Sequence, residues 1–332
     1  MPERNTMKKI QELQQVKGDA YDYYIAGNED TDLFEKIFLV DDIVEEICKP
    51  DKYFLIGEKG SGKTAYSVYM SKSDKINSFC SISLVENTLY QRFLNMKRQK
   101  ALELSSFKDV WINLIYLILA EKIRKEYGET FFSSIKYKQL SKAIDVFYSD
   151  AFKPEFVNAF EFVDNASASI NSMMKQGLFS TGTKASAETS QKYVEQSFQI
   201  SLLKIRDGFE KAFMSVNLKK PTILFVDGID ARPRDIDNEQ YFECLVGLVN
   251  AVLEMNQSFL KEKQIKIMLL IRPDIMYKMP VHNMNQKLRN NSVLLNWVTS
   301  YRKYIDSKLF KIADDYFMKQ QDYSYEPVSY TH

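Results

Sequence analysis

One stretch near the start of the chain has the residue types and the spacing of a phosphate-binding loop. From Gly57 to Thr64 the sequence reads G-x-x-x-x-G-K-T, between an apolar run typical of a buried strand and a segment typical of a helix. Lys63 would contact the β- and γ-phosphates of a nucleotide, and the Thr64 hydroxyl would be a ligand of Mg²⁺. The alternative is a glycine-rich turn without a ligand. The residues predicted to bind the nucleotide are Gly57, Glu58, Lys59, Gly60, Ser61, Gly62, Lys63, Thr64 and Ala65.

Two further apolar runs end in charged residues. The run that starts at Thr222 ends in Asp227, and the run that starts at Ile265 is followed by Arg272. A carboxylate in this position would hold Mg²⁺ opposite Thr64, so the predicted metal ligands are Thr64 and Asp227. Alternatively, Asp227 only begins a loop, and Arg272 is a surface arginine that pairs with Asp274.

The order of the elements predicts the fold class. Apolar strand-like runs alternate with helical segments, which favours an α/β fold with a parallel sheet and helices on both faces. Ligands of such sheets bind at the carboxyl ends of the strands, where Gly57, Asp227 and Arg272 would meet. A second strand is expected over Phe79–Val85, with Cys80, Ile82 and Leu84 facing the core. Helices are expected over Asp32–Cys48, where Asp41 and Asp42 would cap a second helix. Further helices are expected over Phe107–Tyr127, Ile135–Phe152, Phe198–Val216, Glu239–Leu260 and Ser300–Met318.

Composition shifts along the chain suggest four regions. Residues 1–30 are expected to form an N-terminal arm, and residues 31–90 and 195–298 form the α/β core. Residues 91–194 form a large helical insertion with a flexible Ser/Thr-rich loop near 165–191. Residues 299–332 form a C-terminal helical segment with a loose tail.

Bulk composition excludes several classes of function. The formal net charge of +1 gives no overall attraction to nucleic acid or to anionic membranes, although local patches remain open. The 3 cysteines follow no metal-ligand spacing, which fits a reducing cytoplasm, and only 2 histidines are present. The polar N-terminus does not resemble a secretory signal, and the apolar run Val110–Ala120 is too short to span a bilayer. We therefore expect a cytoplasmic protein without a membrane partner.

The run Asp227-Gly-Ile-Asp230 resembles the Walker B motif of STAND-class ATPases, which include NACHT domains and belong to the ASCE division of P-loop ATPases. The resemblance implies that Lys63, Asp227, Asp230 and Arg272 are catalytic: Asp230 would polarise the attacking water, and Arg272 would sense the γ-phosphate. Ala231 departs from the NACHT pattern, which usually has a second acidic residue there, so the resemblance implies nucleotide binding more firmly than fast hydrolysis.

Three motifs, namely the glycine loop, Phe-Val-Asp-Gly-Ile-Asp and Arg-Pro-Asp, also resemble bacterial P-loop ATPases associated with phage defence. The resemblance implies an ATP- and Mg²⁺-dependent switch that forms a homo-oligomer or acts on a protein effector. The insertion would then be the surface that recognises the partner. An arginine finger would complete the site in trans, with Arg232, Arg234 and Arg289 as candidates.

Other functions of the same core stay open. A nucleic-acid-stimulated motor or loader is the main alternative, with Lys97–Lys100 as a small basic cluster, although the net charge does not support it. A GTPase is disfavoured because the Asn-Lys-x-Asp signature is absent; the nearest string, Ser71–Asp74, lies on the first helix. A metabolite kinase is also open, but the chain shows no arginine-rich lid.

Overall fold

The computed structural model describes residues 12–25, 28–85, 107–132, 137–150, 202–230, 237–279, 288–296 and 304–321. Several sequence predictions lie outside these segments. They are the flexible loop near 165–191, the basic cluster Lys97–Lys100, and two of the three arginine-finger candidates, Arg232 and Arg234.

Five strands form one parallel sheet, as the sequence predicts for an α/β protein. The strands are β1 (Phe54–Gly57), β2 (Phe79–Leu84), β3 (Thr222–Asp227), β4 (Ile265–Ile271) and β5 (Ser292–Leu295). Their order is β2-β3-β4-β1-β5, so β2 and β5 are the edges of the described sheet. In the centre, Leu55 of β1 lies beside Leu270 of β4 and Val293 of β5. The carboxyl ends of all these strands therefore lie along one rim.

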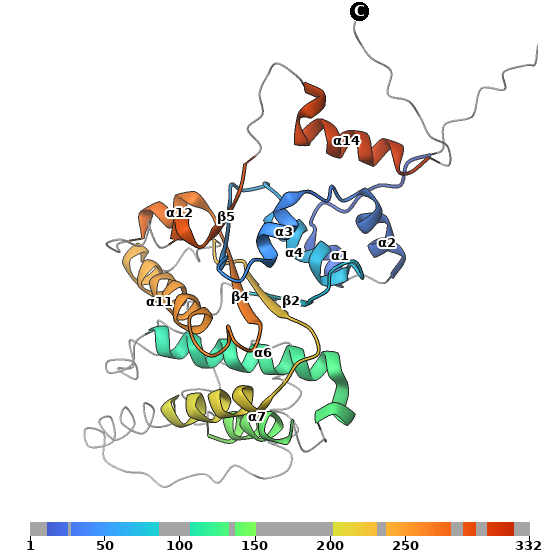
Figure 1. Cartoon of the computed structure of the whole chain (residues 1–332). Helices are drawn as coiled ribbons and strands as arrows, with labels where there is room; N and C mark the ends of the chain where they lie inside the picture. Colours follow the sequence, from blue (N-terminus) through green and yellow to red (C-terminus); the bar gives the residue numbers. More distant parts are fainter. Residues whose placement is uncertain are drawn as a thin grey trace, which may run out of the picture.

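Helices cover both faces of the sheet, because alternate residues of each buried strand point to opposite sides. On β4, Ile267 and Leu269 belong to one apolar cluster, and Met268 and Leu270 belong to the other. Figure 1 shows α6 and α11 on one side of the sheet and α1 to α4 on the other. The helices are α1 (Tyr21–Ile25), α2 (Asn28–Ile37), α3 (Asp42–Cys48), α4 (Lys63–Lys72), α6 (Phe107–Phe132), α7 (Lys138–Asp150), α11 (Asn238–Asn256), α12 (Pro273–Lys278) and α14 (Lys308–Met318). Residues 202–215 are also helical.

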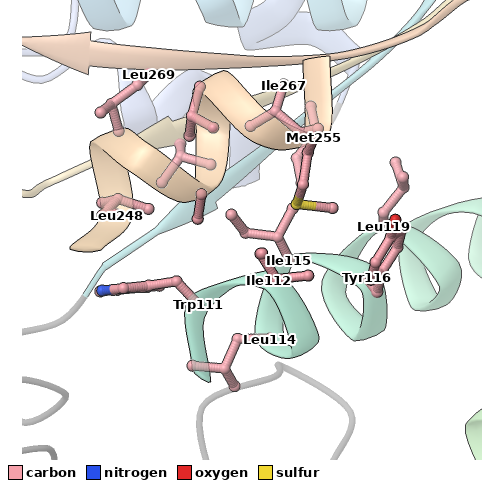
Figure 2. Close-up of a cluster of buried hydrophobic side chains, with 14 of the residues drawn as sticks. Trp111, Ile112, Leu114, Ile115, Tyr116, Leu119, Leu248, Met255, Ile267 and Leu269 are labelled. Atoms are coloured by element: carbon pink, nitrogen blue, oxygen red, sulfur yellow. The ribbon is translucent and has the colours of Figure 1, made fainter. Parts of the chain in front are cut away.

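The larger core lies between α6, α11 and β4. Figure 2 shows Trp111 of α6 near Leu248 of α11, and Met255 of α11 between α6 and β4. The Trp111 indole Nε1 donates a hydrogen bond of 3.0 Å to the Cys244 carbonyl, so the largest buried ring has its polar group satisfied. The two helices touch at Gly247, where an added Cβ would lie 2.6 Å from Cβ of Phe107. Glycine therefore sets the distance between α11 and α6. None of the described helices has the length and apolar character needed to cross a membrane.

Three local predictions differ from the structure. The last helix begins at Lys308 rather than near 300, because the Ser307 hydroxyl caps it by accepting a hydrogen bond from the Phe310 amide. Within the predicted N-terminal arm, α1 forms and its Tyr23 ring stacks on Phe34 in the core. The inward and outward alternation predicted for β2 is wrong at three residues: Leu84 is exposed, whereas Ser81 and Val85 are buried. The prediction assumed that one face of β2 is in contact with solvent, but helices cover both faces of the sheet.

Candidate functional site

The glycine loop connects β1 to α4 with a backbone that requires its glycines. Gly60 and Gly62 have φ angles of +79° and +90°, a region that residues with a side chain rarely adopt. A Cβ on Gly57 would lie 2.2 Å from the Ser61 hydroxyl oxygen. The predicted residues from Gly57 to Ala65 thus form one turn that ends β1 and begins α4 at Lys63. The amides at the start of α4 are suited to an anion.

Lys63 is folded back over its own loop. Its Nζ donates hydrogen bonds of 2.9 Å to the Gly57 carbonyl and 3.1 Å to the Glu58 carbonyl, and the side chain is only 7% exposed. Burial lowers the pKa of the Lys63 ammonium, while the nearby carboxylates of Asp230 and Asp227 act in the opposite direction. A desolvated cation held by two carbonyls is ready to exchange them for a stronger acceptor, such as a phosphate oxygen.

Thr64 and Asp227 meet at the rim, although they are 163 positions apart in the sequence. The Thr64 hydroxyl donates a hydrogen bond of 2.6 Å to Asp227 Oδ2, and the Gly228 amide donates one of 2.7 Å to Asp227 Oδ1. Asp227 is 6% exposed, and burial raises the pKa of its carboxyl despite the two hydrogen bonds, which lower it. Gly228 has a φ of +83° and no room for a side chain, because its Cβ would lie 3.0 Å from the Val85 carbonyl oxygen.

Arg272 lies between two carboxylates at the end of β4. Its Nε and one terminal nitrogen donate two hydrogen bonds of 2.9 Å to the carboxylate of Asp274. On the other side, Nε is 4.0 Å from Asp230 Oδ2. Arg272 and Asp230 also affect the pKa of Lys63, so the ends of β1, β3 and β4 form one charged site. The pairing of Arg272 with Asp274 is the alternative that the sequence left open, and the structure adds the approach to Asp230.

The donors at this rim suit a hard cation that also binds phosphate. No group of three or more His, Cys, Asp or Glu side chains capable of holding a metal occurs among the described residues. Thr64 and Asp227 supply two oxygen donors in contact with each other. Mg²⁺ commonly uses one or two carboxylates and completes its shell with phosphate oxygens and water, so this donor set fits it.

A cavity of about 510 Å³ opens beside the glycine loop. Its walls come from α1 and α2, the loop itself, the end of β5 and α14, which Figure 1 shows beyond the sheet. Most of the lining is apolar or aromatic, including Tyr23, Phe34, Phe38 and Phe317, and Ala65 lies at its floor on α4. Of these residues only Ala65 was predicted from the sequence. The aromatic residues share no local pattern, because they lie on three separate segments that the tertiary fold brings together.

Asp41 connects three elements around this cavity. Its carboxylate caps α3 by accepting from the Ile43 amide, as predicted, and accepts a hydrogen bond of 2.8 Å from the Tyr66 hydroxyl of α4. It also forms an ion pair of 2.6 Å with Lys308 Nζ of α14. The C-terminal helix is thereby attached to the element that follows the glycine loop.

Comparison with protein-family models, with curated proteins and with solved structures gives no match for this chain. Among the arginine-finger candidates, the described Arg289 is exposed in the segment before β5. The geometry of the rim and of the neighbouring cavity is therefore the basis for assigning a function.

Proposed function

We propose that this chain is a P-loop ATPase that binds ATP with Mg²⁺ and acts as a nucleotide-dependent switch. The observation that carries the proposal is the contact between Thr64, at the start of α4, and Asp227, at the end of β3, next to Lys63, whose pKa the Asp227 carboxylate influences. A parallel five-stranded sheet with the glycine loop after a central strand is compatible with a P-loop core. The resemblance of the three motifs to STAND-class ATPases points to the same class.

Phosphate binding would use the groups that now contact the loop. The amides at the start of α4 and the Lys63 ammonium would donate hydrogen bonds to the β- and γ-phosphates, with Lys63 leaving the Gly57 and Glu58 carbonyls. Thr64 and Asp227 would hold Mg²⁺. When bound there, the cation supplies charge neutralisation on the phosphate oxygens during transfer.

Hydrolysis would proceed by attack of water on the γ-phosphorus. The new P–O bond forms as the bond to the β–γ bridging oxygen breaks, which gives ADP and phosphate. Asp230 would orient the water and draw a proton from it. Its carboxylate is 4.0 Å from Arg272, the residue that would contact the γ-phosphate, and this proximity supports the role. Arg272 would exchange its pairing with Asp274 for the γ-phosphate, so that loss of the phosphate restores the ion pair.

The apolar cavity beside the loop supports a nucleoside group at the same site. Aromatic rings such as Phe34 and Phe38 offer flat apolar surfaces to a base, and Ala65 leaves space where α4 begins. Because α14 forms one wall, filling the cavity would alter how this helix is held. Movement of α14 between nucleotide states is the switch that we propose. An oligomer or an effector protein would detect it.

Nucleotide binding is the direct test. We would titrate a fluorescent ATP analogue with and without Mg²⁺ into the wild type, into Lys63→Ala and into Lys278→Ala, which removes an exposed lysine of α12. We expect Mg²⁺-dependent binding that falls by about 100-fold in Lys63→Ala and is unchanged in Lys278→Ala. Competition with unlabelled ATP and GTP identifies the base. A wild type that binds neither nucleotide would refute the proposal.

A nucleic-acid-stimulated motor or loader on the same core is the second candidate. A groove along the edge strand β2 favours it, because five lysines line this groove, namely Lys72, Lys122, Lys125, Lys219 and Lys220. Phosphate release that increases about tenfold or more on addition of DNA or RNA would distinguish it from a switch, whose turnover would not respond.

A further inference from the structure

A large groove lies on the edge of the sheet away from the phosphate rim. Its volume is about 880 Å³, and it follows the first half of β2 from Ser78 to Ser81. Its other walls are α1, the end of α4, the second half of α6 and the residues that lead into β3. Because β2 is an edge of the described sheet, this side of the strand faces the groove rather than another strand.

The groove concentrates positive charge in a chain that is almost neutral overall. Five lysines line it against only two carboxylates, those of Asp74 and Glu126. The lysines are Lys72, Lys122, Lys125, Lys219 and Lys220. Three of them, Lys125, Lys219 and Lys220, have exposed side chains. Since the formal net charge of the chain is only +1, this surface is a local exception and attracts anions.

Aromatic rings lie among these lysines. Tyr21 and Tyr24 of α1 have ring centroids 5.4 Å apart, and Lys72 Nζ lies 5.6 Å from the centroid of the Tyr24 ring. Phe79 and Tyr127 form a second pair on the opposite wall, with centroids 6.2 Å apart. All four rings are partly exposed. Cations that follow a backbone, together with rings on which bases stack, are the two features of sites for single-stranded nucleic acid.

We propose that this groove binds single-stranded DNA or RNA. Lys125, Lys219 and Lys220 contact the phosphates, and the Tyr21–Tyr24 pair stacks on unpaired bases. A duplex is disfavoured, because its bases are already stacked and cannot reach rings inside a groove. The four rings pack against the core on one side, and an acidic peptide would satisfy the lysines without stacking on the exposed parts of these rings. This proposal goes beyond the nucleotide site and does not depend on it.

The groove and the phosphate loop lie at the two ends of one helix. Helix α4 has 10 residues, from Lys63 in the loop to Lys72 in the groove. This corresponds to a separation of about 15 Å along the helix axis. A nucleic acid held at Lys72 would therefore lie at the far end of the helix that presents Lys63 to the phosphates.

The test measures the binding of fluorescein-labelled oligothymidine of about 20 nucleotides to the full chain by anisotropy, in the absence of ATP. The groove variant is Lys219→Glu/Lys220→Glu. The matched control is Lys204→Glu/Lys278→Glu, which reverses two exposed lysines outside the groove. We expect affinity that falls steeply with salt, a loss of about tenfold or more in the groove variant, and little change in the control. Equal losses in both variants, or no binding by the wild type at low salt, would overturn the proposal.

A further variant separates stacking from charge. Tyr21→Leu keeps every lysine and removes a ring, so we expect it to weaken oligothymidine binding several-fold without affecting the binding of polyglutamate. Polyglutamate that binds as tightly as oligothymidine, together with no effect of Tyr21→Leu on either, would show a site for acidic proteins and refute nucleic-acid binding. Thermal melting of each variant confirms that it is folded.

Discussion

The Thr64 hydroxyl donates a hydrogen bond of 2.6 Å to Asp227 Oδ2 across 163 positions of sequence. This contact joins the start of α4 to the end of β3 and brings two oxygen donors together beside Lys63. Burial raises the pKa of the Asp227 carboxyl, so its charged form has a cost in the folded protein. A buried carboxylate whose ionised form lowers the stability of the folded protein is typical of a functional residue rather than of a stabilising one.

Asp227→Asn should therefore separate stability from activity. The amide can donate to Thr64 and accept from Gly228, and it carries no buried charge, so we expect the melting temperature to rise slightly at neutral pH. Turnover of ATP should fall by at least about 100-fold, because the proposed metal ligand is lost. Calorimetry and phosphate release measure the two effects. The control is Asp207→Asn, which replaces an exposed carboxylate and should change neither the melting temperature nor the turnover. Wild-type turnover in Asp227→Asn would exclude the metal role.

Replacing two glycines by alanine should have opposite effects on stability. At Gly247, a Cβ would lie 2.6 Å from Phe107 Cβ and 3.0 Å from the Lys108 amide nitrogen, so overpacking should cost about 1–3 kcal/mol. At Gly208, inside the helical segment 202–215, nothing lies within 4 Å of the added Cβ. There the higher helix propensity of alanine should stabilise the protein by about 0.5–1 kcal/mol. Urea unfolding measures both, and effects of the same sign would contradict the packing described here.

Breaking the ion pair between Lys308 and Asp41 should loosen α14. The pair is partly exposed, so Lys308→Met should reduce the free energy of unfolding by less than about 1 kcal/mol. Amide hydrogen exchange in α14 should nevertheless accelerate several-fold, while that of α11 stays unchanged. Lys319→Met removes an ion pair with Asp315 inside α14 and is the matched control. The same acceleration in both variants would show that the pair with Asp41 has no special role in holding the helix.

Lys266 should make stability depend on alkaline pH. Its Nζ donates to the Ile47 carbonyl and, at 2.8 Å, to the Lys49 carbonyl, and burial lowers its pKa to about 8 from 10.5 despite the opposing influence of nearby Cys48, Cys80 and Asp51. Between these values the unfolded chain binds more protons than the folded protein, so the wild type gains stability as the pH rises.

The gain attributable to Lys266 approaches about 3 kcal/mol when both states are deprotonated. Other groups also titrate in this range, so the quantity to measure is the difference between the wild type and Lys266→Met in urea unfolding from pH 7 to pH 11. We expect the free energy of unfolding of the wild type to increase relative to that of Lys266→Met as the pH rises. A difference that does not change with pH would show that the ammonium is not disfavoured by burial.

The local features of the site follow from the sequence alone. The glycine spacing specified the loop, because Gly60 and Gly62 have φ angles that other residues rarely adopt. The apolar runs that end at Asp227 and Ile271, the second interrupted only by Lys266, indicated buried strands of a parallel sheet, and both strands are fully buried. Asp41 specified a helix start, since its short carboxylate reaches the Ile43 amide. Each of these depends on interactions between neighbours in the chain.

Which of these features meet depends on the tertiary fold. Periodicity indicates that a strand is buried but not which strand lies beside it, so the order β2-β3-β4-β1-β5 and the Thr64–Asp227 contact required the fold. Within the segment 1–30 predicted to be an arm, Tyr21–Ile25 form α1, and its Tyr23 packs on Phe34 in an apolar cluster. The cavity under α14 and the lysine groove beside β2 arise in the same way: each combines residues from several distant segments, which share no local pattern.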